Sequence, residues 1–459
     1  METDERDARI AELEDKVAKL EALVAKLQEQ LGQNSRNSHL PPSSDGPGAH
    51  SKKKRKSKTK RKRGGQKGHR GAHRQLLEPE RVDEFIDLFP EVCLGCGASL
   101  PRLVDPDPRR HQLLDFVDGG AHVTEIRRHE VECRCGHGTR MSYRDAKIPA
   151  SPFGPGLVAA VAVLTGVYHL SRRRAQSLLR ELFGVELSLG AISAMEDRAS
   201  AALEPAVAEA QHEVEAAAVK HADATSWVRA GELMSLWVLA SATVTVYRIL
   251  ADGCRETIEP LFGACKGILV SDRATVFGFW LMAMRQICWA HLLRKFVSFS
   301  ERAPPARDIG DTLLGYTALV FEYWHGYVDG KLTRAELDHF IAPVRQQFEA
   351  TLARAVAADI KGLSGSCANI LAHAEALWTF VSHEGVEPTN NHAERELRAF
   401  VLWRKRSFGS RSERGERFAE RVMTVVHTLR KRGAAVLEFL VASVGARLEG
   451  APPPSLLGA

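Results

Sequence analysis

From Ile10 to Leu31, apolar residues recur at alternating spacings of three and four. They are Ile10, Leu13, Val17, Leu20, Val24, Leu27 and Leu31. This is the heptad pattern of a coiled-coil seam, and β-branched residues at a positions with Leu at d positions favour a parallel dimer. An amphipathic helix packed on its own domain would give the same pattern. We predict a coiled-coil zipper over residues 1–33 that joins copies of the chain as a homodimer or higher oligomer.

Residues 148–212 follow the helical period. An apolar stretch over 157–170 is followed by Ser171, a typical N-cap, while Gly184 and Ser188 mark the end of one helix and the start of the next. Helix, short turn and capped helix is the order of a helix-turn-helix, which binds DNA. A plain helical bundle fits the same pattern equally well.

From about Val214 the apolar spacing changes to that of strands. Five strands are expected, at 218–223, 233–241, 243–250, 267–272 and 285–290. The first three are joined by short turns and are predicted to be antiparallel, whereas a helix near 256–262 precedes the fourth. Three antiparallel strands followed by helix-linked parallel ones is the order of a ribonuclease-H-like fold. We therefore predict a multidomain α+β/α/β protein with a ribonuclease-H-like catalytic core over 213–410.

A long helical insertion interrupts the predicted core. Helical periodicity covers 313–326, 332–357 and 370–383, which places an inserted helical subdomain at 297–385. A closing pair of helices is expected within 411–459.

The formal net charge is only +6, but the basic residues are unevenly distributed. Ten of the twelve residues from Lys52 to Arg63 are Lys or Arg, within a predicted disordered linker over 34–78. Both a solvated tail and an arm that binds DNA phosphates have such a composition. The other features of this chain favour the DNA-binding arm. The predicted phosphate contacts are Lys52, Lys53, Lys54, Arg55, Lys56, Arg61, Lys62 and Arg63.

Four of the eight cysteines form two close pairs, each followed by glycine: Cys93 with Cys96, and Cys133 with Cys135. Two such turns supply four thiolates for a structural Zn²⁺ ion, so a zinc-ribbon-like domain is predicted over 79–147. Unrelated buried cysteines are the alternative. The chain shows no secretory leader and no apolar run of membrane-spanning length. We therefore expect a cytoplasmic, nucleoid-associated protein without a membrane partner, in which metal binding is favoured over disulfides.

Three acidic residues are candidates for chemistry. Asp223 and Asp272 each end an apolar run that predicts a buried strand, and Glu394 lies in a polar, helical segment far downstream. Three carboxylates that converge would hold divalent ions for phosphoryl transfer. Taken singly, each acid also has a structural explanation. An aspartate after a strand is commonly a turn residue or a helix cap, and a glutamate on a helix can balance nearby positive charge. Glu396 competes with Glu394, because residues two apart on a helix point to different faces.

Several motifs resemble those of the insertion-sequence-66 family of transposases, which have an Asp-Asp-Glu triad. They include Gly64-Gly-Gln-Lys-Gly-His69, Ile287-Cys-Trp-Ala-His-Leu-Leu-Arg-Lys-Phe296 and Asn390-Asn-His-Ala-Glu-Arg-Glu-Leu-Arg398, together with the zipper and the cysteine pairs. The resemblance implies that Asp223, Asp272 and Glu394 form the catalytic triad and bind two Mg²⁺ or Mn²⁺ ions. It selects Glu394 over Glu396.

Two positions depart from the family pattern. Ala224 stands where Glu usually follows the first Asp, and Arg273 stands in the turn after the second, where a Gly-Tyr type is usual. Cys288 and His291, as Cys-x-x-His, are similar to a motif of several Asp-Asp-Glu superfamilies; they either bind metal or brace the site, and bracing is our default. Basic residues beside and after the third acid are expected to contact phosphate; they are Arg395, Arg398, Arg404, Lys405 and Arg406.

The resemblance implies a DNA transposase that cuts the ends of an insertion element and joins them to target DNA. DNA is the expected partner at both steps, and small accessory transposition proteins are expected to act with the chain. Two other functions stay open: a hydrolytic nuclease of the same fold, and a DNA-binding regulatory protein descended from a transposase.

Overall fold

The computed structural model describes residues 78–81, 130–132, 138–140, 152–263 and 266–458. The chain divides into two units, and the smaller one, residues 50–122, contributes the 3₁₀ turn η2 (Pro79–Arg81) to this description. The other described elements belong to the larger unit. They include an antiparallel strand pair, β1 (Glu130–Glu132) and β2 (Gly138–Arg140).

Three of the expectations concern residues outside this description. They are the zipper over 1–33, the basic run from Lys52 to Arg63, and the zinc ligands Cys93, Cys96, Cys133 and Cys135. All three stay predictions.

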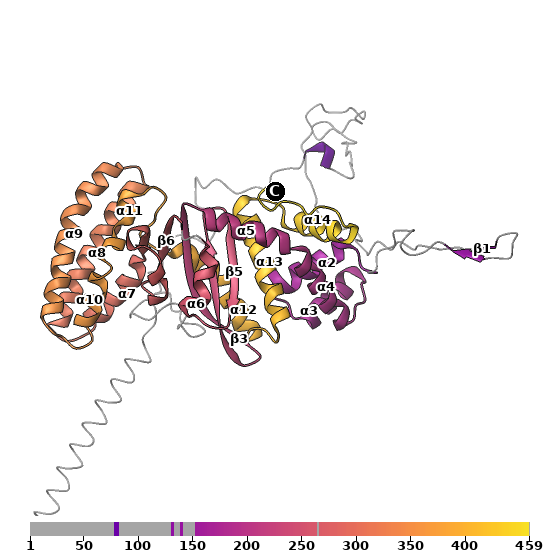
Figure 1. Cartoon of the computed structure of the whole chain (residues 1–459), viewed down its shortest axis with the longest axis horizontal. Coiled ribbons are helices and arrows are strands. Elements are labelled where there is room, and N and C mark those ends of the chain that lie inside the picture. Colours follow the sequence, from indigo (N-terminus) through magenta and orange to yellow (C-terminus); the bar gives the residue numbers. More distant parts are fainter. Residues whose placement is uncertain (1–77, 82–129, 133–137, 141–151, 264–265, 459) are drawn as a thin grey trace, which may run out of the picture. The chain divides into compact units, whose positions relative to one another are not determined.

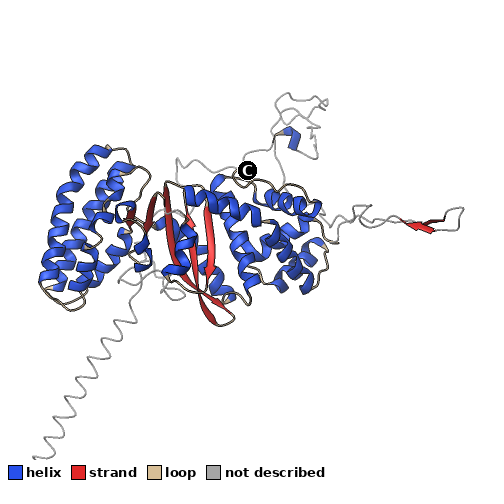
Figure 2. Ribbon diagram, viewed as in Figure 1, coloured by secondary structure: helices blue, strands red, loops and turns tan. Residues whose placement is uncertain are grey.

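A mixed sheet of five strands, in the order β5-β4-β3-β6-β7, forms the centre of the larger unit (Figures 1 and 2). The strands are β3 (Val219–Arg229), β4 (Glu232–Ala240), β5 (Thr245–Leu250), β6 (Ile268–Ser271) and β7 (Arg285–Ile287). Helical turns connect the later strands: α6 (Arg255–Ile258), η4 (Glu259–Phe262), η5 (Thr275–Phe279) and η6 (Met282–Met284). β3, β4 and β5 are antiparallel neighbours, whereas β6 runs parallel to β3 and β7 parallel to β6. This confirms the predicted order of antiparallel and then parallel strands.

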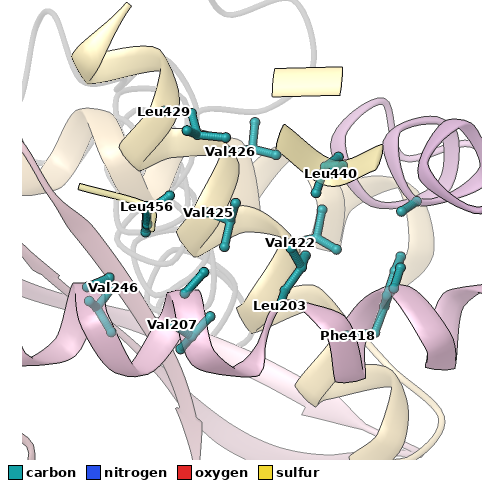
Figure 3. Close-up of a cluster of buried hydrophobic side chains, with 14 of the residues drawn as sticks. Leu203, Val207, Val246, Phe418, Val422, Val425, Val426, Leu429, Leu440 and Leu456 are labelled. Atoms are coloured by element: carbon teal, nitrogen blue, oxygen red, sulfur yellow. The ribbon is translucent and has the colours of Figure 1, made fainter. Parts of the chain in front are cut away.

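Helices from two distant segments form one bundle beside the sheet. They are α2 (Pro155–Ala162), the π turn η3 (Val163–Val167), α3 (Arg172–Phe183), α4 (Leu189–Ala202), α5 (Glu204–Ala216), α13 (Glu413–Arg432) and α14 (Val436–Glu449). Figure 3 shows Val422 of α13 among the same buried side chains as Leu203, which links α4 to α5, and Val246 of β5. The segments that the sequence separates as 148–212 and 411–459 therefore share one hydrophobic core.

Both ends of α3 and the start of α4 are those that the sequence predicts, whereas the apolar stretch over 157–170 is divided between α2 and the π turn η3. The side chains of Ser171 and Ser188 accept hydrogen bonds from backbone N–H groups at the starts of α3 and α4, and Gly184 ends α3 in the left-handed conformation, with φ 65°. α4 is the second helix of the predicted helix-turn-helix, yet Ile192 and Met195 on it are buried in the bundle core. Because the second helix of a helix-turn-helix also packs one face on its own domain, this burial fits both arrangements, and the helix-turn-helix stays a prediction.

The predicted helical insertion lies between β7 and α12 (Asn391–Ser407). α7 (Trp289–Ser300) leads into it, and α8 (Ala306–Val328), α9 (Arg334–Ala357), α10 (Ser364–Leu371), η7 (Ala374–Leu377) and α11 (Thr379–Ser382) follow. One hydrophobic core joins these helices to Ile268 and Val270 of β6, so the insertion is fixed to the strand that precedes Asp272. No helix in the described part of the chain is long and apolar enough to cross a membrane.

The side chains of β4 alternate between two hydrophobic cores. Leu236 and Val238 pack against Phe400 of α12, whereas Trp237 and Leu239 belong to the core that contains the bundle helices. A strand that is buried on both faces has a nearly continuous apolar sequence, which accounts for the long apolar run of β4. The sheet is thus held between helices on either face, and its strand ends are fixed in position.

Candidate active site

The register of two parallel strands sets the predicted aspartates next to each other. In the pairing of β3 with β6, His221 lies opposite Val270. Continuing this register by two residues sets Asp223 opposite Asp272, which directly follows β6. The carboxyl ends of parallel strands are where open α/β sheets bind their ligands. Asp272 lies at such an end, and Asp223 faces it from inside β3, which continues to Arg229 in its pairing with β4.

The third acid reaches this edge through the first turn of α12. Asn390, the residue before the helix, is fully buried, and its side-chain amide donates to the carbonyl of Ala222 (2.8 Å), next to Asp223. Its backbone N–H donates to Sγ of Cys288 (3.1 Å), which directly follows β7. Because Asn390 is bonded to β3 and to the residue after β7, it fixes the first turn of α12, which carries Glu394, beside them.

The three carboxylates are near enough to influence one another's ionisation. Burial raises the pKa of Asp223 from 3.8 to about 7, and the charges of Asp272 and Glu394 add to the rise. A hydrogen bond from the backbone N–H of Ala224 to Oδ1 of Asp223 (2.8 Å) acts in the opposite direction. The site therefore concentrates negative charge in a partly dehydrated place, and a bound cation would relieve it.

Glu394 lies among basic and metal-ligating groups. Its Oε1 is 3.8 Å from Nδ1 of His291 and 3.6 Å from Nη2 of Arg294. Oε1 of Glu394 and Nδ1 of His291 are both buried, and neither has a hydrogen-bond partner among the described residues. One ligand atom each of Cys288, His291 and Glu394 lie within 4.8 Å of one another. Because buried polar atoms without partners are costly, this corner of the site fits a metal ion.

Cys288 and His291 differ in how well their environments suit them to bind a metal ion. Sγ of Cys288 accepts the N–H of Asn390, and burial raises the pKa of this thiol. Metals bind the thiolate, so Cys288 is better suited to bracing the start of α12 than to ligation. Burial, together with the charge of Arg294, lowers the pKa of His291. Its imidazole is therefore neutral at pH 7 and retains a lone pair that can bind a cation.

Glu396 points into a different polar network. His427 lies 2.5 Å and Lys431 3.3 Å from its carboxylate oxygens, and the Tyr247 hydroxyl donates to its backbone carbonyl (2.9 Å). Burial alone would raise the pKa of Glu396, but the hydrogen bond from His427 and the charge of Lys431 lower it to about 2. This side chain therefore joins α12 to α13, and the geometry brings Glu394 rather than Glu396 to the aspartates.

The basic residues expected to contact phosphate on α12 differ in exposure. Arg395, Arg398, Lys405 and Arg406 are exposed. Arg404 is half-buried, and its Nη1 donates to the side chain of Thr225 (3.3 Å) and to Ser226, both on β3. Four of these five cations are thus accessible to a phosphate, and Arg404 mainly fixes α12 to β3.

A cavity of about 640 Å³ opens beside Asp272 and His291, and the sequence prediction misses it. Its walls carry the cations Arg273, Arg294, Lys295 and Arg302, together with Ser298 and Asn369. The spacing from His291 to Ser298 does place these side chains on one face of a helix, which is a detectable signal. Nothing local, however, indicates that Arg273 or Asn369 lies opposite that face.

One family match covers the residues of this site. The Transposase IS66 family matches residues 150–417, which is more than half of the chain. The chain belongs to this family. The matched region of the transposase contains the sheet, the insertion and all three candidate acids, and it confirms the family that the motifs indicate. A second match, to the Family of unknown function (DUF6444), covers residues 1–75, and no match was found among curated proteins.

Proposed function

We propose that this transposase cleaves DNA at the ends of an insertion element and joins the freed ends to target DNA, with divalent ions held by Asp223, Asp272 and Glu394. The observation that carries the proposal is the approach of three carboxylates at one edge of a mixed sheet, beside a basic cavity. The strand order of that sheet supports a ribonuclease-H-like core.

The donor set suits Mg²⁺ or Mn²⁺. Carboxylate oxygens are the ligands that these hard cations prefer, and the unpartnered Oε1 of Glu394 is one of them. When bound, such ions activate the attacking oxygen as Lewis acids and neutralise charge on the scissile phosphate.

A backbone N–H group just after each aspartate orients its carboxylate. Oδ1 of Asp223 accepts the backbone N–H of Ala224 (2.8 Å), and Oδ1 of Asp272 accepts that of Ala274 (2.9 Å). The guanidinium of Arg285 donates to the backbone carbonyl of Asp272 (3.1 Å) and so holds the turn. The positions of these carboxylates are therefore set before substrate binds, which avoids reorganisation during the reaction.

The proposed chemistry is two successive displacements at phosphorus. In the first, a water oxygen bonds to phosphorus and the 3′ oxygen of the element end leaves as a hydroxyl. In the second, that hydroxyl oxygen bonds to a phosphorus of the target, whose own 3′ oxygen leaves. Arg294, beside Glu394, supplies a fixed positive charge near the place where negative charge develops.

The part of the chain before residue 148 completes the proposal. The zipper would pair two subunits on two element ends, and the basic run and a Zn²⁺ ribbon would bind the DNA of those ends. Small accessory transposition proteins would act with this assembly. These roles rest on sequence patterns outside the described residues.

A strand-joining assay tests the proposed function. The full chain is incubated with Mg²⁺, labelled element-end DNA and a plasmid target. Asp272→Ala should abolish the joined product, whereas Asp338→Ala, at an exposed position on α9, should leave it unchanged. Cleavage without joining by the unmodified chain would identify a hydrolytic nuclease, and DNA binding without either reaction would identify a regulatory protein.

A further inference from the structure

A row of cations lines the cavity next to the three acids. Arg294 and Lys295 lie on α7, one turn after His291, and Arg302 follows the end of that helix. Arg273 approaches from the turn after β6, and its guanidinium donates to the side-chain carbonyl of Asn369 on α10 (2.6 Å). The cavity is thus built jointly by the sheet, α7 and the helical insertion.

Most of the positive charge in this cavity has no carboxylate partner. Among the described residues, Arg294 forms a salt bridge with Glu394, but no salt bridge involves Arg273, Lys295 or Arg302. Of the residues that line the cavity, only Asp272 is acidic. Burial, with the nearby charges of Arg302 and Arg273, lowers the pKa of Lys295. Cations that repel one another in a partly buried cavity favour a polyanionic occupant.

We propose that Arg273, Arg294, Lys295 and Arg302 bind the phosphodiester backbone of the DNA strand whose scissile phosphate lies at the three acids. This inference rests on the proposed function and assigns its substrate-binding surface. It also gives the insertion a role, because Asn369 of α10 positions Arg273 at the mouth of the cavity.

The dimensions of the row suit an extended strand better than a single phosphate. From Arg294 to Arg302 the chain advances roughly 12 Å at the rise of an α-helix. One strand of B-DNA carries a phosphate about every 3.4 Å along its axis, so the row spans about three to four nucleotides. Phosphate contacts of this kind fix the position of DNA but do not read its sequence.

Salt dependence of DNA binding tests the proposal directly. Binding of the full chain to a fluorescent duplex of arbitrary sequence is measured without divalent metal, at salt concentrations from about 50 to about 200 mM. Each phosphate contact contributes about 0.9 to the slope of log affinity against log salt concentration. Lys295→Ala and Arg302→Ala should each reduce the slope by about 0.9, and the double variant by about 1.8.

Two further variants keep the test decisive. Lys331→Ala removes one positive charge at the turn between α8 and α9, where Lys331 pairs with Asp329, and it should leave the slope unchanged. Lys295→Arg keeps the charge and should restore the slope, which a folding defect would not allow. Equal slopes for the unmodified chain, Lys295→Ala and Arg302→Ala would overturn the proposal.

A second measurement separates DNA from a free polyphosphate. If inorganic pyrophosphate raises the melting temperature of the unmodified chain but not that of Lys295→Ala, while both alanine variants keep the salt slope of the unmodified chain, the cavity binds a small anion and the proposal is wrong. No change with pyrophosphate, together with the loss of slope, supports a DNA strand. Because the binding assay contains no divalent metal, its result does not depend on whether the chain joins DNA.

Discussion

Substitution of two neighbouring glutamates on α12 should have opposite effects on folding and activity. Glu396→Gln removes a buried negative charge from between His427 and Lys431. Glu394→Gln removes one of three carboxylates that repel one another at the strand ends. The first change should weaken the fold, and the second should abolish strand joining while the fold is kept.

The magnitude follows from the lowered pKa of Glu396. A change from 4.5 to about 2 corresponds to about 3 kcal/mol at roughly 1.4 kcal/mol for each pKa unit. The side chain is 13% exposed, so screening by water reduces this little. Because the pKa is lower in the folded state, this stabilisation is fully present above pH 4.5 and is lost as the pH falls through about 2. Glu396→Gln should therefore lower the free energy of unfolding at pH 7 by about 3 kcal/mol, since it leaves Lys431 buried without its partner.

Urea unfolding followed by tryptophan fluorescence measures this difference as a shift in midpoint at constant slope. At pH 3 the gap between Glu396→Gln and the unmodified chain should shrink to about half, because unfolded Glu396 is then mostly protonated. Glu394→Gln should unfold at the same urea concentration as the unmodified chain or a higher one. Equal destabilisation by both substitutions would refute the assignment of the two glutamates to separate networks.

Three further substitutions have defined outcomes. Gly409→Ala would put Cβ 2.1 Å from the carbonyl oxygen of Val228 at a φ of +97°, and should lower the free energy of unfolding by about 2 kcal/mol or more, as measured by urea unfolding. Ser171→Ala removes the N-cap of α3 and should cost about 1 kcal/mol in the same measurement, with no change in strand joining. Asn390→Ala frees the start of α12 from β3 and β7, and should reduce the rate of strand joining more than it raises the DNA concentration at half-maximal rate.

Local patterns in the sequence account for the elements and for two of the candidate acids. The caps at Ser171 and Ser188 follow from side-chain chemistry within one turn, and the end of β6 follows from a short apolar run that stops before Asp272. Such signals depend on residues close in sequence, so they can be read without the fold. The predicted end of the first strand at Asp223 is wrong, because β3 continues to Arg229 in its pairing with β4. The choice of Glu394 as the third acid depended on the family resemblance, because the local sequence around its neighbour Glu396 is the same.

Features that depend on distant residues could not be predicted in this way. The pairing of Arg273 with Asn369 joins residues almost a hundred positions apart, and the network around Glu396 joins α12 to α13. The packing of α4 with α13 in one core likewise joins segments that are more than two hundred positions apart. In each case the deciding contact is tertiary, and no pattern along the chain indicates it.

The shared core of the bundle has a consequence for synthesis. All three candidate acids precede α13 in the chain, yet α2, α4 and β5 bury their apolar side chains against α13, and α14 also packs in that core. A nascent chain cannot close this core until α13 and α14 have left the ribosome, so the domain completes its folding only after both helices have been synthesised. A chain cut short after Glu394 would contain every predicted catalytic residue and still expose apolar surface to chaperones and proteases. Synthesis of α13 and α14 is thereby required before the predicted catalytic residues lie in a completely folded domain.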